Sequence, residues 1–183
     1  MYLLLLIFFV AVGLIVVIAG YYNRAQELAQ SVKENYANLA VTSKKRLELI
    51  NILIDIARSY SDDEKLTPIT VLNGSPAALA HATLRADSAV SHMNTLARKY
   101  PDLKSNDVFS QVTRDLNKIE PHLHDETALY NGAVKQYNTL CTRIPFLFVA
   151  SSLGFTPASY FNIENTNSQG HFHETFLKSL ILN

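Results

Sequence analysis

The sequence has no tryptophan, one cysteine, six glycines and six prolines among its 183 residues. The single cysteine, Cys141, excludes a disulfide within this sequence and any zinc site built from several cysteines. Sixteen lysines and arginines balance sixteen aspartates and glutamates, so the chain lacks the basic excess with which proteins neutralise nucleic-acid phosphates. Scarce glycine and proline favour helices, because both residues weaken helix interiors. We therefore expect one helix-rich domain that does not bind nucleic acid.

The motifs of common catalytic and nucleotide-binding sites are missing as well. The sequence contains no G-x-S-x-G, P-loop, G-x-G-x-x-G or H-E-x-x-H pattern. On one helix His81 and His92 would lie about 16 Å apart, too far to share a metal ion. The remaining histidines form two H-x-H pairs whose side chains would diverge on a helix: His122 and His124, and His171 and His173. We expect no enzymatic activity, no metal and no cofactor.

The longest apolar run of the chain covers residues 2–22 (YLLLLIFFVAVGLIVVIAGYY) and has no charged side chain. As a helix it would be about 31 Å long, the thickness of the hydrocarbon core of a bilayer. Tyr21 and Tyr22 end the run, as residues of an interfacial aromatic belt do. A cleaved secretory signal is the alternative, but the run has no basic start, exceeds a signal's apolar region in length and lacks an A-x-A site.

We therefore predict that residues 1–22 form a single-pass anchor in the cell (inner) membrane, with residues 2–22 in contact with lipid. Arg24 and Lys33 follow the run. The positive-inside rule then places the rest of the chain in the cytoplasm.

Beyond the anchor, apolar residues recur at steps of three and four in three separate runs. Such steps are typical of long helices that pack with a seven-residue repeat, and the stripes are wide enough for an antiparallel bundle. The runs extend from Ala25 to Tyr60, with Ser43 at one position of the stripe, from Leu79 to Tyr100, and from Phe109 to Ile144. We predict an all-α fold in which the transmembrane helix continues into an antiparallel bundle of long helices over residues 23–161. A polar linker and an apolar tail follow over residues 162–183.

A sharply punctuated segment, residues 99–109 (KYPDLKSNDVF), separates the second run from the third. Pro101 stops a helix after Tyr100, and the polar residues at 105–107 suit the start of the next helix. We interpret the segment as a corner between helices, with Leu103 folded back onto the core. In the alternative interpretation it is a binding site that presents Asp102 and Lys104 to a partner.

The only basic run is Lys44-Lys45-Arg46. On an upright helix it would lie about 30 Å from the membrane, beyond the Debye length of about 8 Å, so it could not hold lipid headgroups. It forms either a solvated helix face or a surface for a partner protein.

Two Tyr-Asn pairs, at Tyr130-Asn131 and Tyr137-Asn138, repeat at seven residues and place both tyrosines on one helix face. A packed stripe with hydrogen-bonded hydroxyls is one interpretation. The other is a flat aromatic docking surface for a partner.

A dense apolar segment follows Pro145 and extends to Phe161, interrupted by Gly154 and Pro157. We expect it to fold back and cover the core, because an exposed patch this apolar is unfavourable in water. Alternatively it contacts a partner or a membrane surface. Its members are Phe146, Leu147, Phe148, Val149, Leu153, Phe155, Tyr160 and Phe161.

Several of these motifs occur together in one order: YPDLKSND at 100–107 with Phe109, YNxAVxxYN at 130–138, Pro145, and VASSLGFTPASYF at 149–161. Together with the apolar anchor, Tyr22-Asn23, the basic run and Leu49-Ile50, they resemble the LemA family over about residues 1–162. Asn51 stands where the family pattern has proline.

The resemblance implies a membrane-anchored antiparallel helical bundle with no established enzymatic activity. Family members are associated with membrane stress and with membrane metalloproteases, which suggests a scaffold or adaptor for partner proteins. The alternative function is a lipid- or envelope-remodelling factor that acts through the apolar C-terminal segment.

Overall fold

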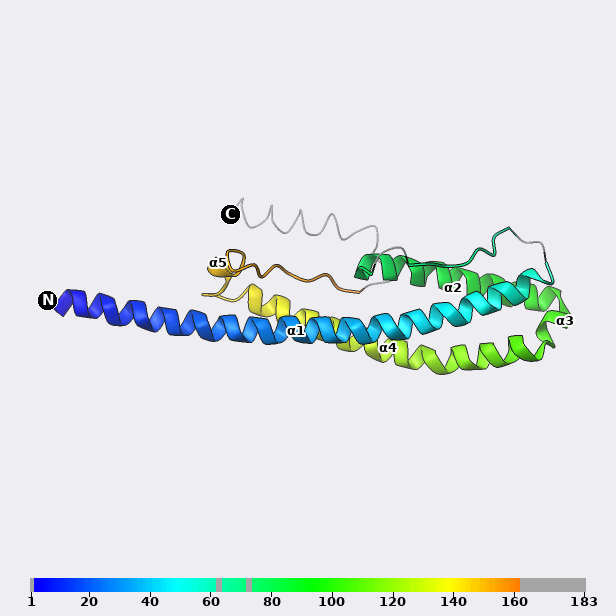
Figure 1. The fold of residues 1–183 in the computed structure, drawn as a ribbon, viewed down its shortest axis with the longest axis horizontal. Helices are drawn as coiled ribbons and strands as arrows, with labels where there is room; N and C mark the ends of the chain where they lie inside the picture. Colours follow the sequence, from blue (N-terminus) through cyan, green and yellow to red (C-terminus); the bar gives the residue numbers. More distant parts are fainter. Residues whose placement is uncertain (1, 62–63, 72–73, 162–183) are drawn as a thin grey trace. The chain divides into compact units, whose positions relative to one another are not determined.

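The computed structural model describes residues 2–61, 64–71 and 74–161. Over these residues the regular structure is entirely helical (Figure 1). The helices are α1 (Tyr2–Arg58), α2 (Pro76–Lys99), α3 (Pro101–Lys104), α4 (Asp107–Cys141) and α5 (Leu147–Ala150). The predicted all-α fold is therefore confirmed. The predicted tail at 162–183, with His171 and His173, lies outside the described residues.

The described chain divides into two compact units. Unit 1 contains the residues up to Asn38 together with Ala128–Tyr160, and unit 2 contains Leu39–Thr127 together with Phe161. Helices α1 and α4 contribute residues to both units. Each unit has an apolar cluster of its own.

Helix α1 begins inside the apolar run and continues without a break to Arg58. Its large apolar side chains from Tyr2 to Val17 are exposed, and the segment is long and apolar enough to cross a membrane. A core helix of a soluble protein would bury this face, and a signal sequence would pass the same test of length and composition. The length and the exposed apolar side chains of this segment support a membrane anchor.

The core of unit 2 forms where stripes of α1, α2 and α4 face one another. Its buried members occupy the predicted positions, for example Ile50 on α1, Met93 on α2 and Leu116 on α4. The segment between α1 and α2 closes this core with Leu66 and Ile69. The amide of Asn51 fixes the segment, because it accepts a hydrogen bond from Ile69 N (2.8 Å) and donates one to Ile69 O (3.0 Å).

The core of unit 1 forms between the start of the polar part of α1 and the end of α4. Ala25 and Leu28 of α1 pack with Tyr137, Leu140 and Cys141 of α4, and the chain after α4 returns over them. The amide of Asn138 holds this return at Ala158, accepting from Ala158 N (2.8 Å) and donating to Ala158 O (2.9 Å).

The prediction that the segment after Pro145 covers the core is confirmed for one side of it only. Phe146 and Phe155 are buried in the unit 1 cluster. Leu147, Phe148, Leu153 and Tyr160 are exposed, Phe148 by 73%. For these four the prediction is wrong. Helix α5 is a single turn that can turn only one face to the core beneath it, and Leu153 and Tyr160 lie beyond its end.

Candidate functional site

The structure separates the three residues of the basic run. Lys44 and Lys45 are exposed, whereas Arg46 is only 6% exposed. Successive residues on an α-helix point about 100° apart, so Arg46 turns toward the core while Lys44 and Lys45 stay on the exposed side. The prediction of a solvated or partner-binding surface is wrong for Arg46 and stays a prediction for the two lysines. The heptad register could have revealed this, since Arg46 follows buried Ser43 by three and precedes buried Ile50 by four.

Arg46 joins all three long helices of unit 2. Its Nε donates to Oε1 of Glu120 on α4 at 2.7 Å, and its Nη2 donates to Oδ1 of Asp87 on α2 at 2.6 Å. Burial lowers the pKa of Arg46, but hydrogen bonds and attraction to Glu120 and Asp87 outweigh it, so the pKa is raised. The guanidinium therefore stays charged and has a structural role.

The segment at 99–109 is a helix corner, as predicted. Helix α2 ends at Lys99 and α3 begins at Pro101, and Leu103 is fully buried. Asn106 caps α4, because its Oδ1 accepts from Phe109 N at 2.9 Å, and its Nδ2 donates to the hydroxyl of Tyr60 at 3.1 Å. These contacts fix the direction in which α4 leaves the corner.

A basic groove lies at this corner of unit 2. It is open, has a volume of about 610 Å³, and is lined by the exposed cations Arg98, Lys104 and Arg114 and by the largely buried Phe109. Among the described residues, no carboxylate lines it. Asp102, predicted with Lys104 as a partner surface, is exposed but does not line the groove. Arg98 and Arg114 were missed, because they lie on different helices and only the corner brings them together.

The tyrosine stripe is part of the core of unit 1, in agreement with the packed interpretation. Tyr130 is 2% exposed, its ring lies 5.7 Å from that of Tyr36, and its hydroxyl donates to Ser159 O at 2.7 Å. Tyr137 is also buried and its hydroxyl donates to the thiol of Cys141. Burial, together with Cys141, raises the pKa of Tyr137 to about 12. Neither tyrosine presents an aromatic docking surface.

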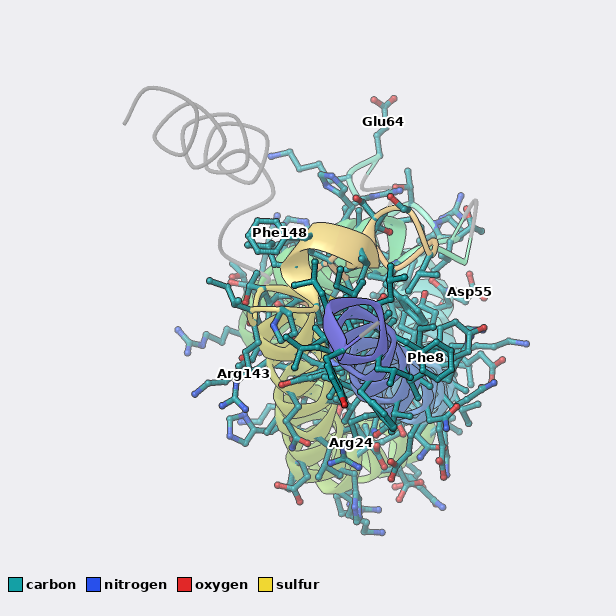
Figure 2. The ribbon with its side chains drawn as sticks, turned by 90° about the vertical axis from the view of Figure 1, so that its left-hand side faces the viewer. Phe8, Arg24, Asp55, Glu64, Arg143 and Phe148 are labelled. Atoms are coloured by element: carbon teal, nitrogen blue, oxygen red, sulfur yellow. The ribbon has the colours of Figure 1, made fainter. Side chains whose placement is uncertain are left out.

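Several large apolar side chains on and beside α5 are exposed. We call Ile144, Leu147, Phe148 and Leu153 the α5 ridge; they are 41–73% exposed. Figure 2, which looks along α1 from its N-terminal end, shows Phe148 standing clear of the ribbon.

A second basic groove lies in unit 1. It is lined by Arg24 of α1, Lys135 of α4 and Arg143, which follows α4, and has a volume of about 500 Å³. Neither groove contains a set of metal ligands. Among residues 2–61, 64–71 and 74–161, no three His, Cys, Asp or Glu side chains are grouped to hold a metal ion.

Comparison with known proteins places the chain in a family. A search of curated proteins finds none that matches the sequence. The family model described as "LemA family" matches residues 35–172, which is most of the chain. This range contains the corner, the tyrosine stripe and the α5 ridge, so the motifs of the sequence and the match agree, and the protein belongs to the LemA family.

Proposed function

We propose that the protein is a single-pass membrane-anchored adaptor that holds partner proteins at the membrane and performs no catalysis. The observation that carries this proposal is the exposed apolar start of α1, continuous with a helical structure whose other large apolar stripes are packed. Burying this segment in lipid removes its apolar side chains from water, the main driving force for membrane insertion.

The corner groove is the surface that we assign to the partner. Three cations without a lining carboxylate attract an acidic segment. Charge of one sign around a groove favours association with complementary charge and discriminates against other partners. The partner is therefore a protein with an exposed acidic stretch. The family resemblance suggests a membrane metalloprotease as one class to examine.

The anchor lies in the cell (inner) membrane in this proposal, with both units in the cytoplasm. Arg24 and Lys33 follow the apolar segment and support this orientation through the positive-inside rule.

Affinity capture tests the proposal with the whole chain in detergent extracts after mild crosslinking. The variant Lys104→Glu/Arg114→Glu reverses two charges of the corner groove, and Lys44→Glu/Lys45→Glu reverses two exposed charges outside it. We expect the groove variant to lose discrete partner proteins that the control variant retains. Circular dichroism checks that both variants fold.

The opposite pattern would move the partner surface to Lys44 and Lys45 and remove the groove from the proposal. If the wild-type protein captures nothing beyond what the apolar segment alone captures, the adaptor function is wrong. A change of vesicle shape on reconstitution would instead favour the alternative, a lipid- or envelope-remodelling factor.

A further inference from the structure

We infer that the α5 ridge is a second membrane contact, which dips into the interfacial layer of the same bilayer that the start of α1 crosses. The inference rests on the membrane anchor of the proposed function. In addition to the crossing by α1, unit 1 then lies against the lipid surface through α5.

The position of α5 along α1 is the first argument. Tyr21 stacks on Phe146 with ring centroids 5.8 Å apart and planes 14° apart, and Tyr22 meets Phe155 edge-on at 5.4 Å. The apolar residues 2–20 would cross about 28 Å of bilayer, so both tyrosines fall at its boundary. The packing therefore holds the α5 ridge at the level of the headgroups and upper acyl chains.

Within unit 1, Figure 1 agrees with this placement. The N-terminal segment of α1 extends beyond α5, which lies beside the helix where that segment ends. A ridge at this place meets the lipid as soon as the segment is inserted.

The composition of the segment is the second argument. Residues 144–161 contain no charged side chain, although many of them are exposed. Exposed apolar clusters in soluble proteins mark contact surfaces, and segments that lie in a membrane interface bury their apolar side about 5–10 Å below the headgroups. Phe148, the most exposed member of the ridge, is of the residue types that interfacial segments bury below the headgroups.

The charges beside the ridge are the third argument. The groove of Arg24, Lys135 and Arg143 is lined by cations and, among the described residues, by no carboxylate. Arg24 also pairs with exposed Glu27, at 2.5 Å. In Figure 2, Arg143 lies on the same side of α1 as Phe148, whereas Arg24 lies on the side of α1 away from α5. Arg143 directly precedes Ile144 of the ridge, and lipid phosphates complement a cation at the level where the ridge enters the acyl chains.

Single tryptophans test the inference in the full chain, because the sequence has no tryptophan of its own. Phe148→Trp reports on the ridge, and Phe8→Trp reports on the apolar start of α1. Leu129→Trp is the matched control, since Leu129 is an exposed apolar residue of unit 1 on α4, away from the ridge. The proteins are reconstituted in phosphatidylcholine–phosphatidylglycerol vesicles with and without bromine on the upper acyl chains, and parallel vesicles carry bromine near the chain ends.

We expect upper-chain bromine to quench Phe148→Trp by at least about twofold, because interfacial side chains reach this depth, and its emission to shift to the blue relative to Leu129→Trp. Leu129→Trp should be unquenched. Quenching of Phe8→Trp by either bromine position shows that the anchor is inserted, independently of the ridge.

If Phe8→Trp is quenched and Phe148→Trp behaves like Leu129→Trp, the ridge faces something other than lipid, such as residues 172–183 or a second copy. The inference about the ridge is then wrong, while the quenching of Phe8→Trp still supports the membrane anchor. If none of the three is quenched, both fail. Equal quenching at Phe148 and Leu129 would also overturn it, since the contact would then not be specific to the ridge.

Discussion

Arg46 occupies a position in the stripe of α1 where the neighbouring positions, Ser43 and Ile50, are buried. A guanidinium can occupy it because its two carboxylate partners remain half exposed, with 48% and 42% of their side chains accessible. The partners keep part of their hydration, so the desolvation cost falls mainly on the arginine. Its geometry matters as much as its charge, because a planar fork can reach two carboxylates on different helices at once.

We expect Arg46→Ala to lower the free energy of unfolding by about 2 kcal/mol, because it leaves two carboxylates without their cation. This is less than a fully buried pair would lose, since water can still reach Asp87 and Glu120. Lys45→Ala, one residue away and exposed, should change the free energy of unfolding by less than about 0.5 kcal/mol. Denaturant unfolding followed by circular dichroism measures both. If Arg46→Ala and Lys45→Ala change the free energy of unfolding equally, Arg46 does not have the structural role described above.

The buried hydroxyl of Tyr137 makes the stability of unit 1 decrease with pH in the alkaline range. Its pKa rises from 10.0 to about 12 on folding, through burial and Cys141. The folded state therefore favours the neutral phenol, and this contribution is fully present below pH 10 and lost as the pH rises through about 12. We expect the melting temperature of the wild-type protein to fall more steeply than that of Tyr137→Phe between about pH 10 and about pH 11.5. Parallel curves would contradict this.

The corner between α2 and α4 illustrates how short polar contacts direct long helices. Pro101 starts α3 where its missing N–H costs no helical hydrogen bond, and Leu103 anchors the turn in the core of unit 2. Ser105 does not cap α4: its hydroxyl donates back to Pro101 O at 3.1 Å and Asp102 O at 3.2 Å. The cap among the three predicted residues is therefore Asn106.

Asn106→Ala should cost about 1–2 kcal/mol of unfolding free energy, because it removes the cap of α4 and the bond to Tyr60. Ser105→Ala, the adjacent exposed residue, should stay within about 0.5 kcal/mol of the wild-type value. Thermal melts of the two variants, measured side by side, show which residue caps α4. A larger loss of stability for Ser105→Ala than for Asn106→Ala would show that Asn106 is not the cap.

The helices and the corner could be predicted because heptad spacing, proline and capping residues act over a few neighbouring positions. Contacts between distant segments could not be predicted in this way. Asn51 forms two hydrogen bonds with Ile69 in the segment between α1 and α2. The residues around Asn51 in the sequence carry no pattern that predicts this partner. The corner groove depends likewise on Arg98 and Arg114 meeting across two helices. For the ridge, apolar composition alone did not tell which side of α5 faces the core.

At the level of the molecule, the apolar start of α1 and the packed units share one helix. The anchor therefore needs no flexible linker, and the part of α1 that packs in unit 1 begins directly at Tyr21 and Ala25. Topology then follows from the charges immediately after the apolar segment.

A single exposed cysteine tests the cytoplasmic placement. In a Cys141→Ser background, Ser91→Cys on the exposed face of α2 introduces one accessible thiol. We expect an impermeant maleimide to label it only after the cells are permeabilised, because in the proposed topology the positive-inside rule places the side that carries Arg24 and Lys33 in the cytoplasm. Labelling in intact cells would reverse the assignment.

The unbroken course of α1 limits how its length can vary among relatives. Inserting one residue turns everything beyond it by about 100° and shifts it by about 1.5 Å, which would rotate Ala25 and Leu28 out of the core of unit 1. An insertion of seven residues restores the phase to within about 20°. Insertions and deletions within the packed part of α1 should therefore occur in steps of seven. Single-residue changes in length should be confined to residues 2–17, which are exposed in the part of the chain that the structure describes, and to the connection between α1 and α2.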